Sequence, residues 1–308
     1  MVENFIELIE KKRFIRTLEA PPPKTAQDLD RYLESLADLD GGIDFINVPD
    51  GLHPHYDSLE AAYRVQEEVG KPAILHVTCR GSREKINSHL LDAHGAGVRN
   101  LIVIKGDGHM GEGFKESHEL IEYISGLNNS YNGHRPDFSM AAALDPYRPE
   151  KEEAEKACRK VLAGTGTFFT QPVFDIDLFL NWLNNVKGYF YDRQGNSNGN
   201  RKEFPPVIVG GMHIPSSKAM SYAKSLMGVR FSGEIEKRLE GKSDQEISDF
   251  FLEKGKEVYQ IVFEEGRKHG CFGFYGCRQR YNFEGMLEIM GIGEGRKSVA
   301  RDRVTAVG

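Results

Sequence analysis

Cysteines are scarce in this chain of 308 residues, which contains only Cys79, Cys158, Cys271 and Cys277. Such a small and widely spaced set argues against a disulfide framework and predicts a reducing, cytoplasmic compartment. Cys271 and Cys277 lack the C-x-x-C spacing of a zinc site, so we expect no metal centre.

A basic surface is also lacking, because 46 acidic residues outnumber 40 lysines and arginines and give a net charge of −6. We therefore expect no nucleic-acid partner. No apolar run is long enough to span a bilayer, so we expect no membrane contact. The acidic, amphipathic stretch Glu3–Lys12 does not resemble a signal peptide and predicts an N-terminal helix.

Eight short β-rich runs alternate with segments of helical apolar spacing. The predicted strands are Phe14–Leu18, Asp44–Val48, Ala73–Thr78, Asn100–Lys105, Phe138–Ala143, Thr167–Thr170, Val207–Gly210 and Gly270–Tyr275. With 308 residues and 39% hydrophobic composition, the chain can bury one sizeable core. Eight alternations over this length predict a (β/α)8 TIM barrel as a single domain over residues 1–308.

The main competing fold is a doubly wound open sheet that binds a dinucleotide. Its G-x-G-x-x-G fingerprint is missing after the first predicted strand. Gly106-Asp107-Gly108 follows the fourth strand but is too short to replace that fingerprint. The sequence therefore favours the barrel.

The interval between the seventh and eighth strands is long for a barrel. It predicts extra helices over Ser216–Leu226, Ser232–Leu239 and Asp244–Lys268. A last helix is expected over Asn282–Ile289. Residues 188–204, which are rich in Gly, Asn and charge, predict a solvated loop, and residues 291–308 predict a surface tail.

Polar residues stand at the carboxyl ends of the predicted strands, which form one rim in a barrel and carry its active site. Glu19 follows the first strand and is held by the rigid turn Pro21-Pro22-Pro23, so it is well placed to be a catalytic acid. Other tips carry Asn47, His76, Thr78, Lys105, Asp107, Ala143, Gln171 and Tyr275. No Ser-His-Asp arrangement or P-loop competes with this rim.

Several of these tips form short motifs in a fixed order along the chain. They are Leu75-His76-Val77-Thr78-Cys79, Ile104-Lys105-Gly106-Asp107, Thr170-Gln171-Pro172-Val173-Phe174-Asp175, Gly210-Gly211-Met212-His213-Ile214-Pro215 and Gly273-Phe274-Tyr275. Together with Glu19, this succession of one motif per strand resembles the methylenetetrahydrofolate reductase family. The resemblance extends from about Phe14 to Ile289.

The resemblance implies an FAD-containing barrel of one-carbon metabolism and methionine biosynthesis that reduces 5,10-methylenetetrahydrofolate to 5-methyltetrahydrofolate. NADH or NADPH would pass hydride to the flavin and leave, and folate would then take its place in a ping-pong cycle. The methylene bridge accepts hydride only after it opens to an N5 iminium cation, which requires a proton at N10. Glu19 matches the acid that delivers this proton, and Asp107 matches the carboxylate that stabilises the cation.

The resemblance also implies which residues bind the ligands. Those matching FAD contacts are Asn47, His76, Thr78, Lys105, Gly106, Asp107, Ala143 and Lys160, with Lys160 suited to the phosphates. Those matching substrate contacts are Gln171, Phe274 and Tyr275, and the Gln171 amide offers both a donor and an acceptor to a pterin edge. The resemblance further implies a homo-oligomer.

Two other functions stay open. The chain departs from the family pattern at Pro49, Lys105, Leu144 and Cys277, which keeps a flavin-free enzyme with direct hydride transfer from NADH to folate as an alternative. A folate-binding or electron-transfer subunit of a larger complex is the other. The sequence does not decide between NADH, NADPH and a protein electron donor, nor between folate and a modified pterin.

Overall fold

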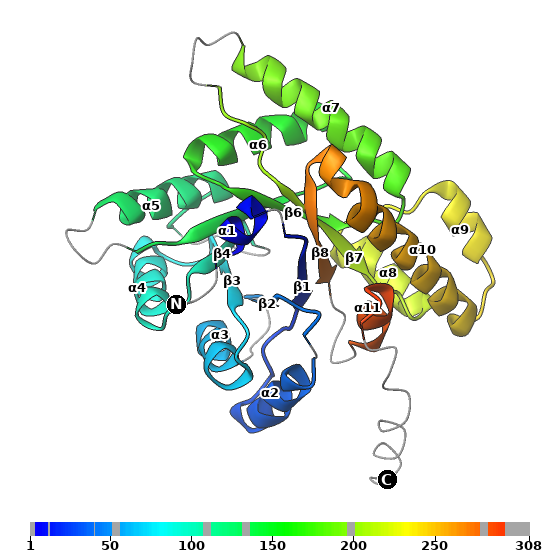
Figure 1. Cartoon of the computed structure of the whole chain (residues 1–308), viewed down its shortest axis with the longest axis horizontal. Helices are drawn as coiled ribbons and strands as arrows, with labels where there is room; N and C mark the ends of the chain where they lie inside the picture. The colour runs from blue at the N-terminus through cyan, green and yellow to red at the C-terminus, as the bar shows by residue number, and fades with distance from the viewer. Residues whose placement is uncertain are drawn as a thin grey trace.

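The computed structural model describes residues 4–11, 13–39, 41–50, 56–106, 112–130, 136–195, 201–277 and 283–292. Eight parallel strands form a closed barrel in chain order, and the last strand pairs with the first. Figure 1 shows the strands at the centre of the molecule with the helices around them. The predicted (β/α)8 barrel is therefore confirmed.

All eight predicted strands are present, with ends that shift by a few residues at most. They are β1 (Ile15–Glu19), β2 (Phe45–Val48), β3 (Ala73–Thr78), β4 (Asn100–Ile104), β5 (Ser139–Leu144), β6 (Thr167–Pro172), β7 (Val207–Met212) and β8 (Cys271–Cys277). Glu19 pairs with Asn47 of the neighbouring strand and so belongs to β1 itself. This pairing fixes the backbone of the proposed acid.

The helices surround the barrel and include the N-terminal helix and the extra helices expected before the last strand. They are α1 (Phe5–Glu10), α2 (Leu29–Ala37), α3 (Ser58–Arg64), α4 (Arg83–Gly95), α5 (Ser117–Ser130), α6 (Glu150–Ala163), α7 (Ile176–Gln194), α8 (Ser217–Leu226), α9 (Gly233–Leu239), α10 (Asp244–Glu265) and α11 (Glu284–Ile289). In the described ranges, no helix is both long and apolar enough to cross a membrane.

The prediction of a loop over residues 188–204 was wrong in its first part, because α7 continues to Gln194. Phe190 is buried, and its ring packs edge-on against Phe204 at 5.1 Å between ring centroids. This tertiary contact outweighs the loop-like composition around it. Residues 196–200 and the predicted tail from 293 onward lie outside the described residues.

Alternate strand residues point into the barrel, and this alternation directs the site residues to its centre. Ile15, Phe45, Ile74 and Phe169 belong to one buried cluster inside the barrel. Phe5 of α1 packs edge-on against Phe45 and Phe169 and closes the amino-terminal end. The open end is therefore the carboxyl end of the strands, where the predicted site residues stand.

Candidate active site

Glu19 and Tyr275 form a pair at the open end of the barrel. The Tyr275 hydroxyl donates a hydrogen bond to Glu19 Oε2 across the adjacent strands β1 and β8. Tyr275 is 6% exposed, and its ring packs edge-on against Phe169 at 5.5 Å between centroids. Burial, with a smaller effect of the Glu19 charge, holds the pKa of the Cys277 thiol well above its usual range. The open end of the barrel therefore combines the oriented carboxyl group of Glu19 with the neutral thiol of Cys277.

Asn47 and His76 also point into the barrel, and each carries a buried polar atom without a partner in the described structure. Asn47 Nδ2 donates to Thr17 Oγ1 at 3.3 Å, whereas its Oδ1 accepts no hydrogen bond. His76 is 7% exposed, and its Nε2 has no partner. Burial lowers the pKa of His76 to about 4, which the Asp50 charge opposes only in part. Such orphan atoms mark places where a ligand or water is expected to bind.

Thr78 belongs to a polar network that ties two rim loops together. Its Oγ1 donates to Asp50 Oδ2 at 2.8 Å, and Arg80 pairs with the same carboxylate at 2.6 Å. Gly106 packs beside this network with φ at 80°, and a Cβ there would lie 3.0 Å from Thr78 Cβ. The predicted catalytic residue Asp107 follows Gly106 directly but lies outside the described residues.

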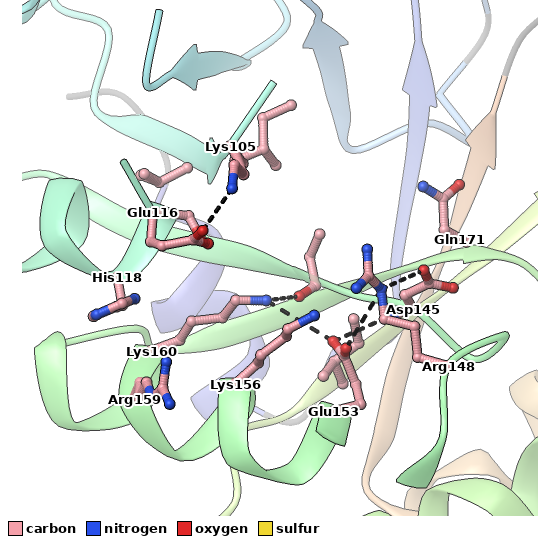
Figure 2. A pocket seen from close by; sticks show the side chains of 15 residues that line it. Lys105, Glu116, His118, Asp145, Arg148, Glu153, Lys156, Arg159, Lys160 and Gln171 are labelled. Carbon is pink, nitrogen blue, oxygen red and sulfur yellow. Dashed lines mark hydrogen bonds and ion pairs between the residues drawn. The ribbon is translucent and has the colours of Figure 1, made fainter. Parts of the chain in front are cut away.

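A pocket of about 380 Å³ lies between the carboxyl ends of β4, β5 and β6 and the helices α5 and α6, as Figure 2 shows. Four predicted ligand contacts line it: Lys105, Ala143, Lys160 and Gln171. Three further cationic side chains line the same pocket: Arg148, Lys156 and Arg159. None of these three was predicted as a site residue, although the spacing of Lys156, Arg159 and Lys160 places them on neighbouring turns of one helix.

Lys160 is less open to the pocket than a phosphate-binding lysine is expected to be. Its Nζ donates to the Ala143 carbonyl at 2.6 Å and lies 3.9 Å from Glu153, to which a dashed line joins it in Figure 2. Its side chain is only 12% exposed, against 34% for Lys156 and 52% for Arg159. Burial lowers the pKa of Lys160 and raises that of Glu153. Lys156 and Arg159 are therefore the more accessible cations.

Two predicted contacts, Lys105 and Phe274, do not lie beside the Tyr275–Glu19 pair. Lys105 forms an ion pair with Glu116 at 2.5 Å on the exposed rim. Phe274 is fully buried between β8 and α10, where its ring packs edge-on against Tyr259 at 5.2 Å between centroids. The alternation of β8 explains this placement, because Tyr275 points into the barrel and its neighbour must point outward. The structure thus corrects the assignment of Phe274 as a substrate contact.

The comparisons with known proteins agree with this architecture. The family model described as Methylenetetrahydrofolate reductase matches residues 4–276.

Among the described residues, no group of three His, Cys, Asp or Glu side chains is arranged to hold a metal ion.

Curated relatives include a probable methylenetetrahydrofolate reductase (NADH) of Oryza sativa subsp. japonica, which is 23% identical over 96% of this chain and 51% of its own length. Methylenetetrahydrofolate reductase (NADH) 1 of Arabidopsis thaliana is 24% identical over 86% of this chain and 47% of its own. This chain therefore spans about half the length of the curated relatives it matches.

A solved structure from Clostridium thermocellum has the same fold, with a TM-score of 0.65 and 15% sequence identity. The match covers 92% of this chain and 96% of the other, which is described as an uncharacterized protein that binds two copies of 5-methyl-5,6,7,8-tetrahydrofolic acid. Because the family model extends over nearly the whole barrel, this chain belongs to the methylenetetrahydrofolate reductase family.

Proposed function

We propose that this chain reduces 5,10-methylenetetrahydrofolate to 5-methyltetrahydrofolate with a reduced nicotinamide as the electron donor. The observation that carries the proposal is the Tyr275–Glu19 pair at the open end of a family barrel. The names of the relatives include both NADH and NADPH enzymes, so either nicotinamide is compatible with family membership.

In this proposal Glu19 delivers a proton to N10 of the folate. Protonation lets the bond between N10 and the methylene carbon break, which leaves an N5 iminium cation that accepts hydride. The hydroxyl of Tyr275 fixes the orientation of the Glu19 carboxyl group, and the half-buried position of Glu19 limits competition from water. Solvent then returns the proton to Glu19 after product leaves.

The pocket of Figure 2 fits the phosphate-bearing part of FAD. Arg148, Lys156 and Arg159 supply positive charge there, and Glu153 Oε2 is buried without a hydrogen-bond donor in the described structure. A ribose or ribityl hydroxyl is a suitable donor to that oxygen. Bound FAD would supply a hydride carrier between the nicotinamide and the folate.

The remaining ligand contacts follow from the same proposal. The orphan atoms of Asn47 and His76 would face the flavin, and the Gln171 amide would hold the pterin. Asp107 would stabilise the iminium cation from its position after Gly106. A single domain, a homo-oligomer and a cytoplasmic location complete the proposal, and the four free thiols agree with a reducing compartment.

The direct test is an absorbance spectrum of the purified chain, followed by anaerobic assays with NADH and with NADPH. We expect flavin absorbance and the formation of 5-methyltetrahydrofolate by the chain alone. A colourless protein that still forms product would favour the flavin-free alternative. A protein that binds folate but forms no product with either donor would favour a subunit of a larger complex.

A further inference from the structure

β6 contains one residue more than the strand β7 that pairs with it, at the carboxyl end where Gln171 stands. The register between the two strands shifts between Phe169 and Pro172, where two residues of β6 lie opposite one residue of β7. These two residues are Thr170 and Gln171. Such an insertion is a β-bulge, which redirects side chains of the strand that contains it. The geometry of the bulge therefore sets where the Gln171 amide points.

The hydroxyl group of Thr170 joins the two strands at the bulge. Thr170 is 3% exposed, and its Oγ1 accepts a hydrogen bond from the Gly210 amide and donates one to the Gln171 carbonyl, each at 2.8 Å. One side-chain oxygen thus serves as the partner of a backbone group on each strand. A side chain of the same shape without this oxygen would leave both backbone groups without that partner.

The bulge also depends on the absence of a side chain at Gly210. A Cβ at this position would lie 2.5 Å from the Thr170 carbonyl oxygen and 2.9 Å from that of Gln171. Glycine permits this close approach of the two backbones. Pairing resumes directly afterwards, because the Val173 amide donates to the Gly210 carbonyl at 2.8 Å. The irregularity is therefore confined to the residues around Gln171.

Tyr147, in the loop between β5 and α6, fixes the residue that follows Gln171. It is half-buried, and its hydroxyl donates to the carbonyl of Pro172. Because proline has no backbone N–H, this carbonyl is the backbone polar group through which residue 172 can be tied to a neighbouring element. The hydroxyls of Thr170 and Tyr147 thus hold two consecutive carbonyls. The Gln171 side chain lines the pocket of Figure 2, where it lies apart from the cations of α6.

We propose that Thr170 and Tyr147 are positioning residues for substrate binding and act through Gln171. The proposal rests on the proposed function, in which the Gln171 amide holds the pterin. This amide offers a donor on one atom and an acceptor on the other, so it matches a pterin edge only when each atom faces its complement. Loss of either hydroxyl group should therefore weaken folate binding without removing a contact to the folate itself.

The test is a double-mutant cycle on the affinity of the full chain for 5-methyltetrahydrofolate. Thr170→Val and Tyr147→Phe each remove one hydroxyl group and should weaken binding about fivefold. Gln171→Ala removes the amide and should weaken binding about tenfold. In the Gln171→Ala background, neither hydroxyl variant should change the affinity by more than about twofold, because the side chain through which they act is gone.

Two matched controls separate this effect from a general loss of stability. Thr167→Val makes the same exchange at the other end of β6, where the buried Oγ1 has no partner in the described structure. Tyr123→Phe removes a hydroxyl group that donates to Asn87 at 2.8 Å between α5 and α4. Both controls should bind folate as wild type does. Thr170→Ser keeps a hydroxyl group and should retain most of the affinity.

Wild-type affinity in both hydroxyl variants would overturn the proposal. The same fold-loss with and without the Gln171 side chain would also overturn it, because the hydroxyls would then act on stability alone. If Thr170→Val is unfolded in a thermal melt, the cycle with Tyr147→Phe decides between these results. Unchanged affinity in Gln171→Ala would overturn the positioning role while wild type still reduces folate. If wild type neither binds nor reduces folate, the proposed function fails, and the positioning role fails with it.

Discussion

The hydroxyl of Tyr275 decides how Glu19 is presented to a ligand, because it holds one carboxylate oxygen across the seam between β8 and β1. Tyr275→Phe keeps the ring against Phe169 and removes only this contact. We expect about a tenfold slower reduction of methylenetetrahydrofolate and unchanged oxidation of NADH with an artificial acceptor. Steady-state assays of both reactions check this, with Tyr222→Phe at an exposed tyrosine as the control. Equal loss in both reactions would contradict an orienting role.

Because His76 is buried, we expect the free energy of unfolding to depend measurably on pH. The folded state holds this histidine neutral with a pKa of about 4, whereas the unfolded chain takes up a proton near pH 6.5. The stabilisation that comes from keeping His76 neutral in the folded state is therefore complete above pH 6.5 and is lost as the pH falls toward 4. At pH 5 the free energy of unfolding should be lower by about 2 kcal/mol. Urea unfolding at pH 7 and pH 5 should show a smaller loss in His76→Gln than in wild type. His269→Gln, at a partly exposed histidine, should behave as wild type.

At the scale of secondary-structure elements, a hydrogen bond from Lys160 joins α6 to β5, and an ion pair between Lys160 and Glu153 lies within α6 itself. Lys160 reaches the Ala143 carbonyl of β5 and neutralises Glu153, which is 2% exposed. Lys160→Met leaves this carboxylate without its buried cation and should lower the free energy of unfolding by about 3 kcal/mol. The double variant with Glu153→Gln should recover most of that loss in urea titrations. A single variant as stable as wild type would show that Lys160 has no structural role.

The strands could be predicted from the sequence, whereas the end of α7 and the burial of Lys160 could not. Alternation of β-rich and helical segments predicted every strand, because each one is a compact apolar run between turns. The end of α7 was missed because the burial of Phe190 depends on Phe204, which comes later in the sequence than the end of the helix. The buried state of Lys160 likewise depends on a carbonyl in another element, so spacing on α6 could not reveal it. The outward direction of Phe274 was accessible from strand periodicity, since Tyr275 faces inward.

For the whole molecule, the barrel gathers Glu19, Asn47, His76, Gln171 and Tyr275 from five strands at one end. Net charge and apolar composition do not indicate that these residues meet at one end. The succession of polar residues at the carboxyl ends of consecutive strands does indicate it. The assignment of Asp107 stays a prediction, because it lies outside the described residues. The chain also spans about half the length of the curated relatives, so activity of the barrel alone is itself a test of the account.

The most direct measurement of that account is the rate at which Glu19→Gln reduces methylenetetrahydrofolate, compared with its oxidation of NADH or NADPH by an artificial acceptor. The amide keeps the size of the side chain and a hydrogen-bonding oxygen for Tyr275 but delivers no proton. We predict that folate reduction falls by roughly 10²- to 10⁴-fold, while nicotinamide oxidation and thermal stability change little. Folate reduction at the wild-type rate would contradict the central claim, because the proposed mechanism would then lack its proton donor.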